Sequence, residues 1–173
     1  MKRLLIVVDY QKDFVDGALG FAKAKTLERG IADRIRTYKA NGDRVVFTFD
    51  THDENYLSTL EGKYLPIKHC LKDTPGWQLY GQVQGELTAD TPVFLKHTFG
   101  SLELALYLQD EEFDQIEFVG LVTNMCVLSN AVLAKAACPN AVISVNASLC
   151  ASFDESLHLK TLDVLKGIHL EII

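Results

Sequence analysis

The sequence predicts one α/β domain, residues 1–173, built in three layers: a doubly wound, mostly parallel sheet with helices on both faces. Short apolar runs alternate with helical stretches along the chain, which is the pattern of repeated βα units. Most of these runs are rich in Val, Ile and Phe and lack in-and-out alternation, as expected for strands that are covered on both sides. The length of 173 residues is enough for one sizeable core.

Six strands are predicted from the apolar runs, and four helices from the stretches between them. The strands cover residues 4–8, 44–49, 92–95, 116–121, 141–145 and 169–173. The helices cover residues 26–41, 101–109, 124–137 and 154–165. The first helix is followed by Gly42, a common helix stop, and the second and fourth begin at the capping residues Ser101 and Asp154. The third is apolar nearly all round, so we expect it to be well buried.

Residues 51–91 interrupt this rhythm. They show little apolar periodicity and contain several Gly, Pro and aromatic residues. Long loops within compact domains are usually functional, so we expect this segment to contribute to a site.

Composition and charge argue against several classes of function. The net charge of −6 disfavours a nucleic-acid partner, which would favour a basic patch. The chain has no run of about 18 apolar residues, so we expect no membrane span. The apolar start of the chain is short and ends at Asp9 without a cleavage site, which favours a buried first strand over a signal peptide. The four cysteines show no pairing pattern, and we expect reduced thiols in the cytoplasm.

Cys126 is the candidate nucleophile. It lies between the strand predicted at 116–121 and the helical stretch that continues from Val127. Backbone N–H groups and the helix dipole at such a turn favour an anion, so we expect them to lower the pKa of the thiol. A thiolate there would be a reactive nucleophile.

Reactive residues also follow the neighbouring strands. The first strand ends at Asp9, the second at Asp50, and the third at Lys96. Because parallel strands end at the same edge of a sheet, we expect these side chains to converge with Cys126. Lys96 would stabilise a thiolate and Asp9 would serve as a general base. Two backbone N–H groups in the turn after the fourth strand are the natural oxyanion donors.

A metal site is a second possibility at this edge. Asp50 and His52 are two positions apart, and His69 lies in the long loop. Two imidazoles and a carboxylate suit Zn²⁺, Mn²⁺ or Fe²⁺ with positions left open. From spacing alone, a purely structural role for both histidines stays open.

Five motifs together resemble those of one family. They are residues 9–14 (DYQKDF) with 17–19 (GAL), residues 50–52 (DTH), residues 69–70 (HC), Lys96, and residues 120–127 (GLVTNMCV). In this order, and over nearly the whole chain, they resemble the isochorismatase-like cysteine hydrolases, and within that superfamily most of all the nicotinamidases. The resemblance implies a doubly wound, mostly parallel sheet of six strands and a thioester intermediate on the cysteine. The branch named for isochorismate hydrolysis lacks this cysteine, which argues against that activity.

The resemblance also assigns roles to single residues. It implies a catalytic triad of Asp9, Lys96 and Cys126. It further implies a cis peptide bond between Leu121 and Val122, with the oxyanion bound by the backbone amides of Val122 and Cys126.

For the metal, the resemblance implies that Asp50, His52 and His69 hold an ion, most readily Zn²⁺, that receives the pyridine nitrogen of the substrate. Glu61 best matches the loop carboxylate that joins the metal in some members, with a plain surface carboxylate as its alternative.

Three further residues complete the expected substrate-binding set. Phe14 and Tyr64 match aromatic residues that contact the substrate ring, although residues 63–69 hold one residue more than the usual pattern. Gln11 is the third, with support of the turn after the first strand as its alternative.

We therefore expect a cysteine hydrolase that cleaves the C–N bond of a small amide, foremost nicotinamide, to give nicotinate and ammonia. One alternative is the same chemistry on another small amide, such as a carbamoyl or ureido compound, without a metal. A second alternative is a non-catalytic binding protein with this fold. The resemblance also implies a homo-oligomer, either a dimer or a tetramer.

Overall fold

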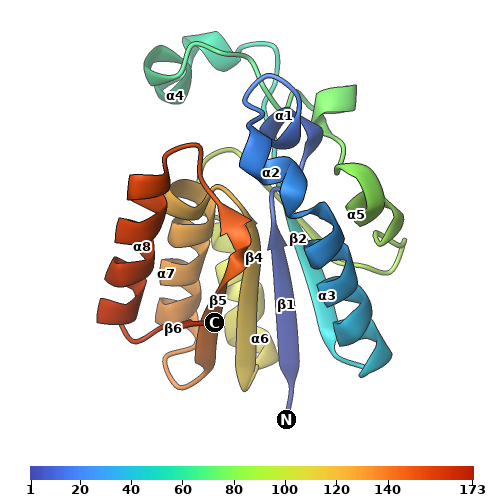
Figure 1. The fold of residues 1–173 in the computed structure, drawn as a ribbon, viewed down its shortest axis with the longest axis vertical. Coiled ribbons are helices and arrows are strands. Elements are labelled where there is room, and N and C mark those ends of the chain that lie inside the picture. The colour runs from blue at the N-terminus through green and yellow to red at the C-terminus, as the bar shows by residue number, and fades with distance from the viewer.

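Six parallel strands form one sheet through the middle of the molecule (Figure 1), in the order β3-β2-β1-β4-β5-β6. The computed structural model describes residues 1–173. Every neighbouring pair of strands is parallel. The strands are β1 (Arg3–Val8), β2 (Arg44–Asp50), β3 (Val93–Lys96), β4 (Gln115–Leu121), β5 (Val142–Ala151) and β6 (Glu171–Ile172).

Two groups of helices cover the two faces of this sheet. One face carries α6 (Leu102–Glu111), α7 (Leu128–Ala137) and α8 (Glu155–Gly167). The other carries α2 (Ala22–Thr26), α3 (Glu28–Ala40) and α5 (Gly81–Gly85). The side chains of β1 alternate between the two cores, so this central strand is buried on both sides.

The remaining helical pieces are short and lie near the carboxyl ends of the strands. They are α1 (Lys12–Val15), the 3₁₀ turns η1 (Tyr56–Ser58) and η2 (Pro75–Trp77), α4 (Leu60–Tyr64), and the π-helical turn η3 (Thr123–Val127). In Figure 1, η1 and α4 lie at the top of the molecule, above this edge of the sheet.

The predicted fold class is confirmed, and the differences lie at the ends of elements. β5 extends to Ala151, six residues beyond the predicted strand, because Cys150 and Ala151 pair with the end of β4 after a register shift. The last strand begins at Glu171 rather than 169, since His169 adopts a positive φ of 68°. The third predicted helix splits into η3 and α7.

Strand order reverses between β1 and β4, whose neighbours lead to opposite edges of the sheet. In open α/β sheets, ligands bind outside the carboxyl ends of the strands at such a switch point. Asp9 follows β1, and Lys96 is the last residue of β3, so their placement here comes from topology. None of the helices has both the length and the apolar character needed to span a bilayer.

Candidate active site

Lys96 is the centre of the buried cluster that the strand ends create. Its Nζ lies 2.6 Å from Asp9 Oδ2 and 3.2 Å from Asp50 Oδ1. The same Nζ lies 3.4 Å from Cys126 Sγ and donates a hydrogen bond of 3.1 Å to the Thr98 carbonyl oxygen. The structure therefore brings together the cation, the thiol and the carboxylates that the sequence predicts at one edge.

Asp9 is fully buried and sits just beyond β1 with a positive φ of 44°. Thr48 on the neighbouring strand donates a hydrogen bond of 2.7 Å from Oγ1 to Asp9 Oδ1. Burial raises the pKa of Asp9, the Lys96 ammonium opposes this, and the charge of Asp50 adds to it. A carboxylate whose pKa is raised is a better proton acceptor than an exposed one.

Cys126 belongs to η3, the π-helical turn that begins directly after Val122. The peptide bond between Leu121 and Val122 is cis, as the resemblance implies. Gly120, with a φ of +117°, lies against β1 so closely that a Cβ would overlap the Val8 carbonyl oxygen. Glycine at this position allows the end of β4 to approach β1, which brings the turn of Cys126 next to Asp9.

The expectation of a lowered thiol pKa is wrong. Burial raises the pKa of Cys126 well above its usual value; Lys96 lowers it, but Asp9 and Asp50 raise it further. Desolvation and the two nearby carboxylates together outweigh the effect of Lys96, and this balance favours the neutral thiol over the thiolate. Its proton needs an acceptor, and Asp9 is the buried carboxylate with a raised pKa.

Asp50, His52, Glu61 and His69 form a second group beside this cluster. Their ligand atoms all lie within 4.8 Å of one another. Asp50 Oδ2 is 3.1 Å from His52 Nε2 and 3.3 Å from His69 Nε2, and Glu61 Oε1 is 3.8 Å from His52 Nε2. His69 Nδ1 lies 2.8 Å from the Ile67 carbonyl oxygen, which fixes the ring with Nε2 toward the carboxylates.

Asp50 links the two groups because each of its oxygens faces a different one. Oδ1 meets Lys96, and Oδ2 meets the two histidines. Burial alone would raise the pKa of Asp50, but Lys96 and the hydrogen bonds with His52 and His69 hold it well below its usual range. Burial and the nearby charge of Asp50 raise the pKa of Glu61.

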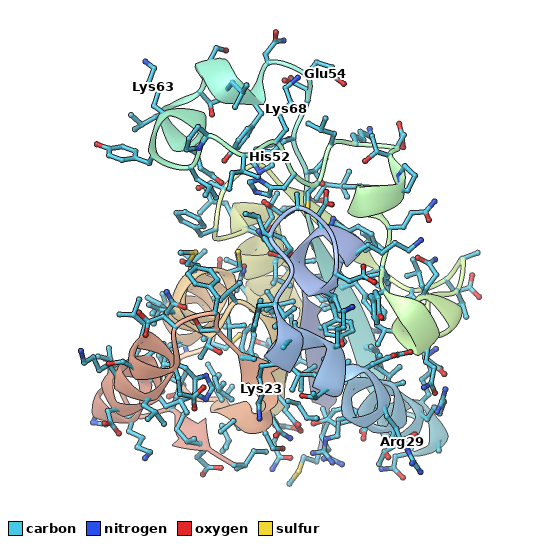
Figure 2. The ribbon with its side chains drawn as sticks, turned by 45° about the horizontal axis from the view of Figure 1, so that its top comes forward. Lys23, Arg29, His52, Glu54, Lys63 and Lys68 are labelled. Carbon is cyan, nitrogen blue, oxygen red and sulfur yellow. The ribbon has the colours of Figure 1, made fainter.

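Backbone contacts fix the histidines on a loop of little regular structure. The His52 N–H donates to the Cys70 carbonyl oxygen (3.0 Å), and the Cys70 N–H donates to Asp13 Oδ2 (2.7 Å). The ring of Tyr56 in η1 packs against both histidine rings at 4.5 and 4.9 Å between centroids. Figure 2 labels His52 beneath this loop, with the ion pair of Lys68 and Glu54 (2.8 Å) above it.

Gln11 differs from its predicted role. It is fully buried, and its Nε2 donates to the carbonyl oxygens of Asp50 (2.9 Å) and Trp77 (2.8 Å). Its Oε1 accepts a hydrogen bond of 2.8 Å from the Asp50 N–H. Both polar atoms of the Gln11 side chain are hydrogen-bonded to backbone groups, including those of Asp50. Gln11 therefore supports the position of Asp50 and does not face the cavity.

A cavity of about 450 Å³ opens over Cys126. Phe14 and Tyr64 line it, as predicted, and Phe14 meets the His69 ring edge-on at 5.6 Å. Val122, Cys126, Asp50, Glu61 and His69 face the same space. The other lining residues were missed by sequence reasoning, because they come from separate loops without a shared pattern: Leu19, Gly20, Leu65, Phe99, Met125 and Phe153.

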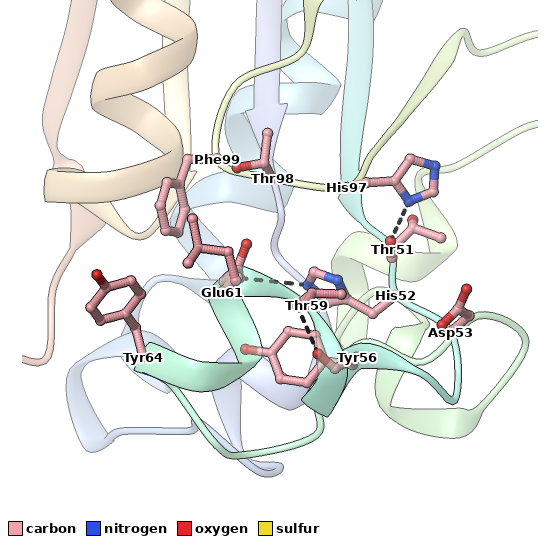
Figure 3. Close-up of a pocket in the computed structure, with 11 residues that line it drawn as sticks. Thr51, His52, Asp53, Tyr56, Thr59, Glu61, Tyr64, His97, Thr98 and Phe99 are labelled. Carbon is pink, nitrogen blue, oxygen red and sulfur yellow. Dashed lines mark hydrogen bonds and ion pairs between the residues drawn. The ribbon is translucent and has the colours of Figure 1, made fainter.

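A second cavity of about 540 Å³ lies on the other side of the metal-ligand group (Figure 3). His52 faces this outer cavity, whereas Asp50 and His69 face the cavity over Cys126. Three residues line both spaces: Glu61, Tyr64 and Phe99. The candidate metal ligands therefore stand at the partition between the two cavities.

Comparison with known proteins decides the family. The Isochorismatase domain model matches residues 3–172, nearly the whole chain. The chain belongs to the isochorismatase family. It is 31% identical over 150 residues to the uncharacterized isochorismatase family protein PncA of Bacillus subtilis, covering 76% of this chain and 78% of that protein.

Solved structures agree with this assignment. The pyrazinamidase/nicotinamidase of Streptococcus mutans superposes with a TM-score of 0.89 at 29% identity, covering 99% of this chain and 100% of the other. The pyrazinamidase of Pyrococcus horikoshii, solved in complex with zinc, has the same fold with a TM-score of 0.87 at 24% identity, covering 100% and 99%. The predicted similarity to nicotinamidases is confirmed, and the chain is an amidohydrolase.

Proposed function

We propose that this chain hydrolyses nicotinamide to nicotinate and ammonia through a thioester on Cys126. The observation that carries the proposal is the contact of one ammonium, Lys96, with Asp9, with Cys126 and with the carboxylate of Asp50 that also faces two histidines. This contact supports the roles of Cys126 as nucleophile and Asp9 as base, beside a group of side chains suited to bind a metal and a ring nitrogen. Similarity to a pyrazinamidase/nicotinamidase supports the same substrate class.

The first step transfers the thiol proton of Cys126 to Asp9 while Sγ forms a bond to the amide carbon. Burial raises the pKa of Asp9, which makes this carboxylate a stronger proton acceptor than an exposed one. The carbonyl π electrons move to oxygen, and the backbone N–H groups of Val122 and Cys126 would bind that oxyanion. Lys96 offsets the negative charge of the cluster.

The second step breaks the C–N bond. The oxyanion re-forms the carbonyl, the nitrogen leaves, and Asp9 returns its proton to it, which releases ammonia and leaves a thioester. Water then attacks the thioester carbon while Asp9 accepts its proton, and the bond from carbon to Sγ breaks. Asp9 returns the proton to the sulfur, so nicotinamide and water are converted to nicotinic acid and ammonia.

The residues present fit a divalent metal. Two imidazole nitrogens and two carboxylates converge within 4.8 Å, and one of these carboxylates, Asp50, shares the ammonium of Lys96 with Asp9. We infer that Asp50, His52, Glu61 and His69 hold Zn²⁺, with Mn²⁺ or Fe²⁺ compatible with the same donors. When bound, such an ion supplies a Lewis-acidic position for the pyridine nitrogen.

The walls of the cavity support an aromatic substrate. Phe14, Tyr64, Phe99 and Phe153 surround the space over Cys126. Aromatic rings favour stacked or edge-on contacts with another ring. A small aliphatic carbamoyl compound would leave most of this apolar surface without a contact.

A screen for ammonia release tests the proposal. Nicotinamide, pyrazinamide, and simple carbamoyl and ureido compounds are compared at equal concentration, with Cys126→Ala as the control. We expect the two aromatic amides to be hydrolysed and the Cys126→Ala protein to be inactive. If ammonia is released from only the carbamoyl or ureido compounds, the substrate is such a compound and not nicotinamide. If the protein is inactive on all of them and Cys126 is unreactive, a non-catalytic binding role is favoured.

Two further predictions accompany this function. A homo-oligomer, either a dimer or a tetramer, is expected, and light scattering at working concentration tests it; a monomer would contradict it.

A cytoplasmic location is expected from the unpaired buried cysteines. Fractionation of the source cells tests this second expectation.

A further inference from the structure

Asn130 is a buried polar residue in α7, a helix that is otherwise mainly apolar. Its amide makes three hydrogen bonds. Nδ2 donates to the carbonyl oxygens of Cys126 (2.8 Å) and Phe99 (3.0 Å), and Oδ1 accepts from the Ser101 N–H (2.9 Å). An amide side chain offers two donors and one acceptor atom, so both its nitrogen and its oxygen are engaged.

These three partners belong to two different segments of the site. Cys126 is the nucleophile itself, in the turn after β4. Phe99 and Ser101 lie in the loop between β3 and α6, and Ser101 also caps α6 by accepting from the Leu104 N–H. Asn130 is therefore a direct bridge between the turn that carries the thiol and the loop after β3.

The bridged loop has two contacts with the reaction centre. The Thr98 carbonyl oxygen accepts a hydrogen bond from Lys96 Nζ, so the loop helps to hold the ammonium that touches Sγ. The ring of Phe99 lines both the cavity over Cys126 and the outer cavity. Figure 3 labels Phe99 and Glu61 among the residues that line the outer cavity.

We propose that Asn130 is a positioning and specificity-determining residue, an inference that rests on the proposed function. By tying both segments together, it holds the Cys126 backbone in register with Lys96 and fixes Phe99 as the wall of the substrate cavity. A displacement of about 1 Å between reacting groups lowers rates by about 100-fold, so a bridge of this kind affects chemistry as well as folding. Its effect on Phe99 decides how large a ring the cavity accepts.

Two substitutions separate the parts of this role. Asn130→Leu keeps the approximate size of the side chain and removes all three hydrogen bonds. Asn130→Asp keeps an acceptor for the Ser101 N–H but loses both donors to carbonyl oxygens. Ser129→Ala, at the neighbouring half-buried position of the same helix, is the matched control.

Three measurements are made on each variant: kcat and KM per active site, the rate at which iodoacetamide alkylates Cys126, and the thermal unfolding midpoint. Nicotinamide and its ring-fused analogue quinoline-3-carboxamide are the substrates. We expect both Asn130 variants to lose about 10- to 100-fold in kcat per active site. We expect slower alkylation of Cys126, and a changed ratio of kcat/KM for the two amides, while Ser129→Ala stays at the wild-type values.

Phe99→Ala provides the specificity arm. The double variant combines Asn130→Leu with Phe99→Ala. If Asn130 limits the size of the accepted ring through Phe99, the ratio of kcat/KM for the two amides in the double variant differs little from that in Phe99→Ala alone. The effects of residues that act through one another are not additive. Additive changes in the ratio would overturn the specificity role.

The positioning role is overturned if folded Asn130→Leu has wild-type kcat per active site and wild-type alkylation, or if its only defect is a smaller fraction of active sites. Should Asn130→Leu fail to fold, Asn130→Ser, which keeps a single hydroxyl, takes its place with the same criteria. Alkylation of Cys126 needs no substrate. A failure of nicotinamide hydrolysis by the wild type is thus distinguished from a failure of this inference.

Discussion

Two buried carboxylate clusters in this protein differ in how completely they are paired. In the first, called here the support cluster and made of Glu117, Arg34, Tyr38 and Asn146, one carboxylate receives all the donors. Arg34 Nε lies 2.9 Å from Glu117 Oε1, Tyr38 donates from its hydroxyl at 2.8 Å, and Asn146 Nδ2 donates at 3.1 Å. Burial alone would raise the pKa of Glu117, but these hydrogen bonds lower it.

The second, the active-site cluster of Asp9, Asp50, Lys96 and Cys126, is less completely paired. Two carboxylates share one ammonium, and the thiol beside them carries no charge at rest. The pKa of Asp9 is raised by burial in spite of its ion pair with Lys96. Both clusters are buried, so burial alone does not separate them.

This difference in pairing indicates which buried charges stabilise the fold and which are available for a reaction or a ligand. A carboxylate whose donors are all supplied by the chain has no reason to take up a proton or a ligand. A cluster with an excess of negative charge gains from a proton on one member or a cation beside another. Asp9 and Asp50 are those two members. The pKa of Asp9 is raised, so its ionisation opposes folding, whereas Asp50 faces the two histidines.

The largest expected effect comes from removing Asp9, the proposed general base. Asp9→Asn keeps the shape of the side chain and its contact with Thr48 but cannot accept the thiol proton. We expect kcat to fall by about 10⁴-fold, as for other members of catalytic triads. Steady-state ammonia release measures the loss.

The comparison predicts that this variant remains as stable as the wild type or becomes more stable, because one of two crowded carboxylates is gone. Urea unfolding at neutral pH checks this. A variant that keeps more than a tenth of wild-type activity would show that Asp9 is not the base, and a large loss of stability would show that Asp9 belongs with the support cluster.

The next effect concerns the metal. Asp50→Asn removes the charge that faces both histidines, and we expect metal affinity to fall by at least about 100-fold. The zinc content after dialysis, measured by mass spectrometry of the metal, is the readout. Glu54→Gln, an exposed carboxylate on the same loop, is the control and is expected to keep the wild-type content.

Chelation of the wild type should lower activity on nicotinamide and leave the alkylation of Cys126 measurable. Equal zinc content in Asp50→Asn and in the wild type would mean that Asp50 is not a metal ligand and that the metal binds elsewhere.

A smaller effect is expected from the support cluster. Arg34→Met leaves Glu117 buried without its ion-pair partner, and because the Arg34 side chain is 30% exposed we expect a loss of about 2–3 kcal/mol, less than for a fully buried pair. The free energy of unfolding in urea measures it, and kcat should stay within about twofold.

Arg29→Met on the same helix is the matched control, since its ion pair with Asp33 is exposed and worth at most about 0.5 kcal/mol. A similar loss in both variants would mean that the support cluster does not stabilise the fold as a buried pair does.

Sequence reasoning reached the active-site cluster more readily than the support cluster, and the reason is topological. Asp9 directly follows a strand, and Asp50 and Lys96 each end one in the same parallel sheet, so the chain order of strands and helices already brings them together. Glu117 lies within the apolar strand β4. A charged residue at such a position indicates that a buried partner exists, but no sequence motif identifies that partner. Its partners come from α3 and β5, and only the three-dimensional fold shows that pairing.

Magnitudes were harder to predict than positions. The turn of Cys126 was placed correctly, but its pKa depends on burial and on two carboxylates whose distances are not in the sequence. The roles of Gln11 and Asn130 were equally hard to predict, because each side chain hydrogen-bonds to the backbone of segments distant in the sequence. Such contacts have no spacing rule.

The smallest predicted effect compares the pH dependence of the two clusters. The pKa of Glu117 is lower in the folded state than the value of about 4.3 expected in the unfolded chain. Its ionised form therefore contributes stability that is fully present above that value and is lost as the pH falls through the folded pKa. The pKa of Asp9 is raised, so its ionisation opposes folding as the pH rises through the value of the unfolded chain.

Urea unfolding from neutral to acidic pH separates these signs. We expect the stability advantage of the wild type over Glu117→Gln to be largest at neutral pH and to shrink in acid, with a slope of at most about 1.4 kcal/mol per pH unit from this group. For Asp9→Asn the difference runs the other way: the variant gains on the wild type as the pH rises toward neutrality. If both variants changed with pH in the same direction, the two clusters would not differ in the way their pairing implies. Glu117 would then be as incompletely paired as Asp9, in spite of its three donors.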